Sequence, residues 1–222
     1  MRPLVRGVYA ITRDEPSTKL LAAQVIEALA GGLRLLQYRN KLANKLLALE
    51  QASALRKLTH DAGARLIIND DIELALAISA DGVHLGRHDG RNEGVLVDLD
   101  LIRQRASQTT PHKERFLVGI SCYDEMGAAR VAAAAGADYI AFGSFFPSPT
   151  KPRAAHADMS LIRHAKREFP LPVVAIGGIT VENTPQLVDA GADAVAVISS
   201  LFDSDNIRAR AQSFTSLFPD NV

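Results

Sequence analysis

A short motif recurs three times in this sequence, and each copy leads into an apolar run. The copies are Ser79-Ala80-Asp81-Gly82-Val83, Gly136-Ala137-Asp138-Tyr139-Ile140 and Gly191-Ala192-Asp193-Ala194-Val195, at offsets of 57 and 55 residues. Each offset is about twice the roughly 28 residues that one βα unit needs, and eight units of that size fill the 222-residue chain. We interpret each copy as a helix end, a tight turn and the start of a new strand.

Eight apolar runs are candidate strands. Most lack polar alternation, which is typical of strands buried on both faces of a parallel sheet. They are residues 5–11, 33–37, 65–68, 82–85, 116–120, 139–142, 172–176 and 194–198. Helical patterns fill most of the gaps. Residues 43–62 carry one apolar face, and Gly63 is a natural stop. Asp124 and Thr180 are expected to cap two later helices.

This alternation predicts an α/β fold, a closed (β/α)8 TIM barrel in a single domain over residues 1–222. The competing hypothesis is a doubly wound open sheet. That fold usually has a Gly-rich loop directly after its first strand. Here the first strand is followed by Thr12-Arg13-Asp14-Glu15, so the barrel is favoured.

Composition narrows the class of protein. Apolar residues make up 47% of the chain and charged residues 23%, which argues for a globular domain and against disorder. The 25 Lys and Arg balance the 25 Asp and Glu, so no nucleic-acid partner is expected. No apolar run approaches the roughly 20 residues that span a bilayer, so no membrane partner is expected. The single cysteine, Cys122, fits a reducing compartment, and we expect a cytoplasmic protein.

Polar residues concentrate after the strands. In a barrel of this kind, chemistry occurs in the loops at the carboxyl ends of the strands. Those positions hold Gln37-Tyr38-Arg39-Asn40-Lys41, Asn69-Asp70-Asp71, Gly86-Arg87-His88-Asp89, Ser121, Ser148-Pro149-Thr150-Lys151, Gly177-Gly178 and Ser199-Ser200. The opposite ends carry mainly the Asp turns, which we interpret as structural.

The acids and cations at this end predict a magnesium and diphosphate site. Magnesium is usually held by one or two carboxylates plus substrate phosphates, a role that suits Asp70 and Asp89. Arg39, Lys41 and Lys151 suit a diphosphate. Each group alone also has a structural explanation, which is a solvated loop for the cations and a helix N-cap for one residue of Asn69-Asp70-Asp71.

Gly177-Gly178 followed by Thr180 predicts a separate phosphate site, because glycines let backbone N–H groups approach a phosphate. A plain tight turn is the alternative.

The long loop of residues 143–157 has the length of a lid. Cys122 is expected to pack at the rim rather than act as a nucleophile. Together these features favour a magnesium-dependent enzyme that joins two phosphorylated small molecules and releases diphosphate.

Five motifs, in order along nearly the whole chain, resemble thiamine phosphate synthase. They are Gln37-Tyr38-Arg39-Asn40-Lys41, Asn69-Asp70-Asp71, Asp81-Gly82-Val83-His84-Leu85-Gly86, Pro147-Ser148-Pro149-Thr150-Lys151 and Ile176-Gly177-Gly178-Ile179. The resemblance implies a (β/α)8 barrel and a transferase of thiamine biosynthesis. It also implies two substrates, 4-amino-2-methyl-5-hydroxymethylpyrimidine diphosphate and a thiazole phosphate. The enzyme would join them to each other, which forms thiamine phosphate and releases diphosphate.

The resemblance also implies roles for single residues. The pyrimidine diphosphate contacts carried over are Gln37, Tyr38, Arg39, Asn40, Lys41, Asn69, Ser121 and Lys151, of which Arg39, Lys41, Ser121 and Lys151 are the expected catalytic groups. The magnesium ligands are Asp70 and Asp89. The thiazole phosphate contacts are Ser148, Pro149, Thr150, Gly178, Ile198 and Ser199. The chain departs from the family pattern at Gly86-Arg87-His88-Asp89, where the family often has Gly-Gln-Glu-Asp.

The implied reaction is dissociative, so the pyrimidine methylene–oxygen bond breaks before the thiazole nitrogen attacks. Two alternatives stay open. A thiazole tautomerase would need an acid/base residue over the thiazole but no diphosphate cations, and a non-catalytic phosphate-binding barrel would use the same binding residues. The sequence also leaves open whether the barrel is a monomer or a homo-oligomer.

Overall fold

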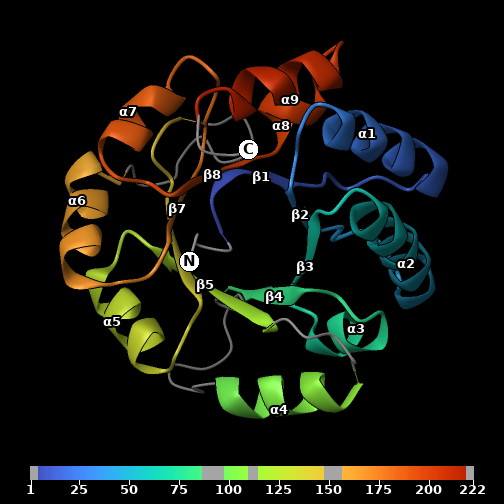
Figure 1. Cartoon of the computed structure of the whole chain (residues 1–222), viewed down its shortest axis with the longest axis horizontal. Coiled ribbons are helices and arrows are strands. Elements are labelled where there is room, and N and C mark those ends of the chain that lie inside the picture. Colours follow the sequence, from blue (N-terminus) through green and yellow to red (C-terminus); the bar gives the residue numbers. More distant parts are fainter. Residues whose placement is uncertain (1–4, 87–97, 110–114, 148–156, 219–222) are drawn as a thin grey trace.

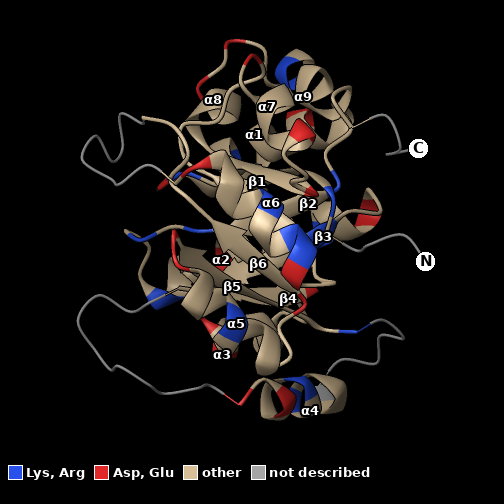
Figure 2. Cartoon of the chain, turned by 90° about the vertical axis from the view of Figure 1, so that its left-hand side faces the viewer, with Lys and Arg blue, Asp and Glu red and all other residues tan. Residues whose placement is uncertain are grey.

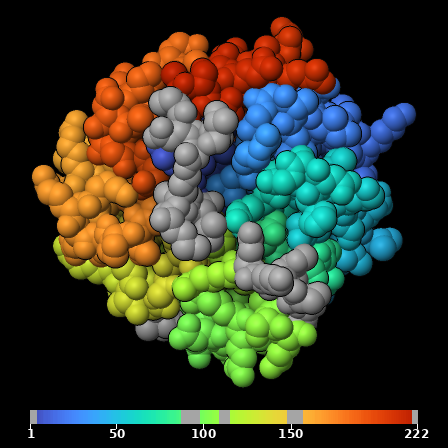
Figure 3. Space-filling model, in the orientation of Figure 1, coloured from blue at the N-terminus to red at the C-terminus, as the bar shows by residue number. Residues whose placement is uncertain are grey.

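The computed structural model describes residues 5–86, 98–109, 115–147 and 157–218. Eight parallel strands form a closed barrel in the order β1 to β8, and the helices lie outside it (Figure 1). β1 pairs with β8 as well as with β2, which closes the barrel and excludes the open sheet. The predicted barrel is therefore confirmed. The units follow one another around the molecule in sequence order (Figure 3).

The predicted strands all exist, with small shifts at their ends. The strands are β1 Gly7–Ile11, β2 Leu35–Tyr38, β3 Arg65–Asn69, β4 Gly82–Leu85, β5 Leu117–Tyr123, β6 Tyr139–Phe142, β7 Val173–Ile176 and β8 Ala194–Val197. The helices are α1 Thr18–Ala30, α2 Lys45–Asp61, α3 Ile72–Ala77, α4 Leu99–Thr109, α5 Met126–Ala134, α6 Met159–Glu168, α7 Thr184–Asp189, α8 Ser199–Phe202 and α9 Ile207–Thr215. The largest shift is in β5, which runs past the expected end at Ile120 to Tyr123.

Two apolar cores explain why the strands lack polar alternation. One core fills the barrel interior and includes Tyr9, Leu35, Ile67 and Tyr139. The other lies between the strands and the surrounding helices. A strand that contributes to both cores has apolar side chains on both faces. Among the described residues no helix is both long enough and apolar enough to cross a bilayer.

The repeated Asp turns are structural clamps at the amino ends of the strands. Oδ2 of Asp81 accepts hydrogen bonds from the backbone N–H of Leu66 at 2.7 Å and from the Arg56 guanidinium at 3.3 Å. This clamp therefore joins the start of β4 to the neighbouring strand β3 and to the helix α2.

The other two copies repeat this arrangement. Asp138 accepts from the N–H of Val118 and from Arg103, both at 2.8 Å. Asp193 accepts from the N–H of Val173 and from Lys166, both at 2.7 Å. The structural interpretation of these turns is confirmed.

Two of the predicted helix caps are wrong, and one is confirmed. α5 has Glu125 at its N-cap rather than Asp124, and no side chain caps it. α7 begins after Asn183, whose Oδ1 accepts from the backbone N–H of Thr180. Thr180 therefore starts a turn that delays the helix. Asp71 caps α3 by accepting from the N–H of Leu74, as expected for one residue of that motif.

Candidate active site at the carboxyl ends of the strands

The residues predicted for the site fall into two groups. Asp89, Ser148, Pro149, Thr150 and Lys151 lie outside the described residues. Those that the structure describes are Gln37, Tyr38, Arg39, Asn40, Lys41, Asn69, Asp70, Ser121, Gly178, Ile198 and Ser199. This second group lies at, beyond or within two residues of the carboxyl ends of β2, β3, β5, β7 and β8, an end of the barrel that we call the mouth.

Gln37 and Ser121 face the barrel interior just below the mouth. Nε2 of Gln37 donates to the hydroxyl oxygen of Tyr9 at 2.8 Å. On the other side of the barrel, Oγ of Ser121 lies 2.9 Å from Nε2 of His84. Both side chains are thus held by partners on other strands, Tyr9 on β1 and His84 on β4.

A further tyrosine connects these two pairs. The Tyr139 hydroxyl lies 2.9 Å from the Tyr9 hydroxyl and 3.1 Å from Nδ1 of His84. The five side chains Gln37, Tyr9, Tyr139, His84 and Ser121 therefore form one continuous hydrogen-bonded chain across the interior. Ser121 is partly exposed, and the other four side chains are buried. We call this chain the interior relay.

The interior relay is uncharged at neutral pH. Burial lowers the pKa of His84 to about 4, although the nearby negative charge of Asp70 acts in the opposite direction. Burial also raises the pKa of Tyr139 well above its ordinary value, and the neighbouring Tyr9 adds to this shift. The pKa of Tyr9 is raised as well, again mainly by burial. The floor of the mouth is therefore polar but neutral.

Arg39 and Lys41 lie in the loop after β2, which is tied to the loop after β1. The Thr12 hydroxyl accepts from the backbone N–H of Arg39 and donates to its carbonyl oxygen, both at 2.8 Å. Oδ1 of Asp14 accepts from the backbone N–H of Lys41 at 2.7 Å and lies 3.4 Å from Nη1 of Arg39. These contacts position both cations at the mouth, and the carboxylate of Asp14 partly balances the positive charge of Arg39.

Asn40 and Tyr38 make structural contacts in this structure. The Asn40 amide nitrogen donates to the carbonyl oxygen of Glu15 and to Oε1 of Gln51, at 2.8 and 3.1 Å. The Tyr38 hydroxyl donates to the same Oε1 at 2.9 Å, and burial raises the pKa of Tyr38 to about 12. Since Gln51 belongs to α2, the Tyr38 side chain points away from the barrel interior. The structure thus does not bring the Tyr38 and Asn40 side chains together with Gln37 in the interior.

Asp70 is held at the end of β3 in an unusual backbone conformation. Its φ is 59°, in the left-handed region that residues other than glycine rarely adopt. Oδ1 accepts from the backbone N–H of Gly86 at 2.8 Å, and Oδ2 accepts from the Asn69 amide at 2.7 Å. Each carboxylate oxygen keeps a lone pair, so Asp70 can still bind a cation. Among the described residues, no three His, Cys, Asp or Glu side chains cluster as a metal site.

Gly177 and Gly178 allow the loop after β6 to pack against the end of β7. Their φ values are 106° and 63°. A Cβ at Gly177 would lie 2.1 Å from Oγ of Ser144, and one at Gly178 would lie 2.4 Å from the carbonyl oxygen of Pro147. This close packing explains both glycines without a ligand. Nearby, Ser199 begins the four-residue helix α8, and such short extra helices after β8 often help to bind phosphate in this fold.

Comparison with known proteins decides the family. The family model described as thiamine monophosphate synthase (TMP-TENI) matches residues 8–201. The chain belongs to this family. The thiamine-phosphate synthase of Thiobacillus denitrificans is 49% identical over 98% of this chain and 97% of its own length. The thiamine-phosphate synthase of an Azoarcus species is 46% identical over 96% of this chain and 98% of its own length. The thiamine phosphate pyrophosphorylase structure from Pyrococcus furiosus superposes with a TM-score of 0.78 at 28% identity, covering 97% of both chains.

Membership of the thiamine monophosphate synthase family confirms the predicted resemblance and the transferase class. Structures from other enzymes share the fold at lower identity. One is a geranylgeranylglyceryl phosphate synthase from Thermoplasma acidophilum, with a TM-score of 0.65 at 19% identity over 95% of this chain and 93% of its own. At this identity the similarity supports the barrel fold and says nothing about the reaction.

Sequence reasoning missed the centre of the interior relay. Tyr9 and Tyr139 fall inside predicted strands, and His84 appears only within one of the five family motifs, so none of the three is a predicted site residue. One feature of the sequence could have indicated them. Each is a polar side chain within an otherwise apolar, buried strand, and a buried polar group needs a hydrogen-bond partner. Asp14 was also missed as a partner of Arg39, although its position after the first strand matches that of the other mouth residues.

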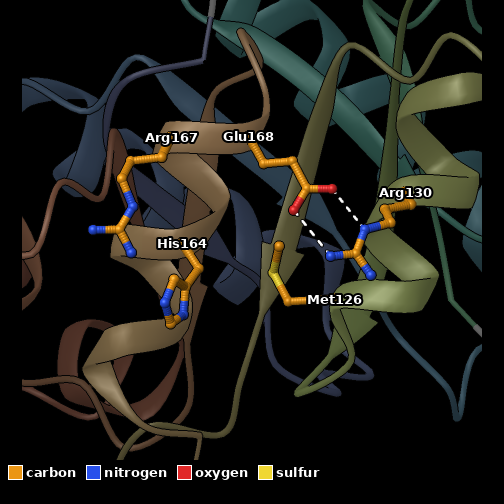
Figure 4. A pocket seen from close by; sticks show the side chains of 5 residues that line it. All are labelled: Met126, Arg130, His164, Arg167 and Glu168. Carbon is orange, nitrogen blue, oxygen red and sulfur yellow. Dashed lines mark hydrogen bonds and ion pairs between the residues drawn. The ribbon is translucent and has the colours of Figure 1, made fainter.

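An open groove also lies on the outer surface between α5 and α6, and none of the predicted site residues lines it. Met126, Arg130, His164, Arg167 and Glu168 line it, and Arg130 is paired with Glu168 at 2.6 Å (Figure 4). Basic residues lie on both helices, and α6 ends in an acidic residue (Figure 2). Cys122 is buried and faces the helices, which agrees with the packing role expected for it.

Proposed function

We propose that the protein is a thiamine-phosphate synthase that joins the hydroxymethylpyrimidine diphosphate to a thiazole phosphate and releases diphosphate. The observation that carries the proposal is the relationship to the Thiobacillus denitrificans synthase, which extends over 98% of the chain. The geometry of the mouth is compatible with this reaction, because cations, a carboxylate and a neutral polar floor occupy the ends of neighbouring strands.

The diphosphate would bind to the cationic side of the mouth. Arg39 and Lys41 are anchored there through their backbones, so little reorganisation is needed when negative charge grows on the leaving group. Arg39 would exchange its long contact with Asp14 for phosphate oxygens. Lys151 is expected to add a third cation.

Magnesium is the proposed metal, with Asp70 and Asp89 as its protein ligands. Asp70 fits this role because two hydrogen bonds orient its carboxylate while lone pairs remain free. When bound, the metal would neutralise negative charge on the departing diphosphate.

The neutral interior relay favours a dissociative path. Breaking the methylene–oxygen bond leaves a cation that spreads into the pyrimidine ring. A protonated histidine below the ring would repel that cation, and the low pKa of His84 keeps its imidazole neutral. Gln37 and Ser121 would hold the ring in place from opposite sides of the relay. No general base or covalent nucleophile is required.

The thiazole phosphate would bind across the ends of β7 and β8. Gly178, Ile198 and Ser199 are the described residues proposed for it, with Ser148, Pro149 and Thr150 as further contacts. Ile198 packs against the interior core and Ser199 opens α8, so an apolar ring and a phosphate group can be bound side by side. Holding both substrates in this way would lower the entropic part of the barrier.

The test is direct synthesis. Purified protein is mixed with the pyrimidine diphosphate, the thiazole phosphate and Mg²⁺, and thiamine phosphate is measured by chromatography with and without a chelator. Product should form, stop with the chelator and return with excess Mg²⁺. Isomerisation of the thiazole phosphate alone would identify a tautomerase, and binding without turnover would identify a binding protein. Either result would contradict the proposal.

A matched pair of variants tests the cationic side. Arg39→Gln removes a cation at the mouth, whereas Arg34→Gln removes an exposed one from the opposite end of β2. We expect Arg39→Gln to lower kcat/KM by about 100-fold, the effect typical of removing one charge-stabilising group. Arg34→Gln should remain within a factor of about 2, because exposed substitutions change little.

A further inference from the structure

The interior relay consists of groups whose donors and acceptors constrain one another. Gln37, Tyr9, Tyr139, His84 and Ser121 come from five different strands and are linked by four contacts of 2.8 to 3.1 Å. A phenol and a serine hydroxyl each carry a single proton, and a neutral imidazole carries a proton on only one nitrogen. The proton positions in such a chain are therefore coupled from end to end.

In the observed orientation every donor points in the same direction. Nε2 of Gln37 can only donate, so the Tyr9 oxygen accepts from it and the Tyr9 proton is directed to Tyr139. The Tyr139 proton then goes to Nδ1 of His84. The His84 proton must accordingly be on Nε2, where it is donated to Ser121. The proton of Ser121 is left free to point into the mouth.

Only the complete reversal of this order is also self-consistent. If Gln37 turned its Oε1 to Tyr9, each proton would point the other way and Ser121 would donate to His84. Ser121 could then only accept from a ligand. A mixture of the two orders would either set two lone pairs against each other, or make one buried tyrosine hydroxyl accept from both neighbours and leave its own proton without a partner in the relay. Both arrangements are costly.

Packing fixes the central tyrosine of the relay. The Tyr139 ring lies against the backbone of Gly119, where a Cβ would be 1.9 Å from the ring carbon Cζ. The His84 ring stacks on Tyr139 with centroids 5.6 Å apart, and the Tyr9 ring meets Tyr139 edge-on at 6.0 Å. Only glycine at position 119 leaves room for a ring that reaches across the barrel. The relay is thus part of the barrel's construction.

We propose that Tyr9, Tyr139 and His84 form a one-directional hydrogen-bond relay that makes Ser121 a donor and Gln37 an acceptor towards the substrate. The three are positioning residues, because they act through Gln37 and Ser121. The assignment of the ligand rests on the proposed function. An aminopyrimidine presents both N–H donors and ring-nitrogen acceptors, so it can meet the Oε1 of Gln37 and the hydroxyl proton of Ser121 simultaneously.

The proton on His84 can be located without any substrate. The protein is labelled with ¹⁵N-histidine, and one of its six histidine signals is assigned to His84 by its loss in His84→Gln. The ¹⁵N shifts and one-bond couplings then show which ring nitrogen carries the proton. We expect Nε2–H in the wild-type protein. A proton on Nδ1 would overturn the proposal.

A remote variant tests whether the order is transmitted. Gln37→Glu replaces the donor with a carboxylate, and spectra are recorded at a pH where the ¹³C signal of that group is that of the ionised form. Tyr9 must then donate to it, and we expect the proton of His84 to move to Nδ1. Gln51→Glu is the matched control, since Gln51 is equally buried but bonds to Tyr38. It should leave the proton on Nε2. No movement in Gln37→Glu would contradict a coupled relay.

Measuring KM for the pyrimidine diphosphate shows whether Tyr9 positions the substrate-binding residues or only stabilises the fold. Tyr9→Phe keeps the ring and removes the linking hydroxyl, and we expect KM for the pyrimidine diphosphate to rise about 3- to 10-fold, the effect of one weakened hydrogen bond. Thr59→Val is the control, because it also removes a buried hydroxyl but lies in α2 outside the relay. An unchanged KM in Tyr9→Phe would refute the positioning role. Absence of thiamine phosphate formation by the wild type would refute the proposed function instead and leave the histidine result valid.

Discussion

The Asp138 clamp offers a quantitative test of how the barrel is stabilised. The Asp138 carboxylate has about 10% of its side chain exposed and accepts from the Val118 N–H and from Arg103, both at 2.8 Å. Arg115 also lies 2.6 Å from its second oxygen. Asp138→Ala would remove all three contacts and leave a β5 N–H without a partner.

The expected loss of stability follows from these contacts. An orphaned buried N–H costs about 1–3 kcal/mol. Removing one partner of a buried ion pair costs about 3–5 kcal/mol, but Arg103 is 16% exposed and keeps a hydrogen bond to the Gly136 carbonyl oxygen, so the lower end applies. We expect the free energy of unfolding to fall by about 3 kcal/mol. With a urea m-value of about 3 kcal/mol/M, the midpoint would fall by about 1 M.

The same arginine supplies the control. Asp100 also pairs with Arg103, at 3.2 Å, but its side chain is 92% exposed. Asp100→Ala should cost less than about 1 kcal/mol, because exposed ion pairs contribute little. Urea titrations followed by circular dichroism measure both variants. Equal losses for the two variants, or a loss under about 1 kcal/mol for Asp138→Ala, would refute the clamp as a source of stability.

The remaining predictions concern the site. Asp70→Ala should retain the fold, with some loss of stability because two hydrogen bonds are removed at a positive φ, and lower kcat by about 100-fold or more in the synthesis assay; near-normal turnover would contradict its role at the metal. Gly119→Ala should displace Tyr139 and raise KM, whereas Gly127→Ala, whose Cβ meets nothing within 4 Å, should leave KM unchanged. The folded-state pKa of His84 is depressed from 6.5 to about 4, so the unfolded chain binds the extra proton first. Stability is therefore complete above pH 6.5 and should fall by about 3 kcal/mol as the pH drops to 4, and urea titrations of His84→Gln should show a flatter pH dependence.

The sequence predicted the elements that depend on local pattern. Apolar runs between Asp turns located all eight strands, since strands buried on both faces leave an unbroken apolar signal. The turn glycines and the Asp71 cap were also correctly placed because their roles involve residues within a few positions of each other.

Features that depend on distant neighbours could not be predicted in this way. Asn183 displaced Thr180 as the start of α7 because its side chain closes a turn with the Thr180 N–H. The contact between Tyr9 and Tyr139 joins residues 130 positions apart, and no local spacing encodes it. The predicted site residues at positions 89 and 148–151 lie outside the described part of the chain and stay predictions.

The Asp clamps have a consequence for how this chain can be cut and rejoined. Each clamp is made within one short stretch, from Arg56 to Asp81, from Arg103 to Asp138 and from Lys166 to Asp193. No clamp spans residues 82–102 or 139–165, which include the connections that follow β4 and β6 at the mouth. New chain ends introduced there by circular permutation would leave every clamp whole. Insertions and deletions in those connections can likewise accumulate without loosening the base of the barrel.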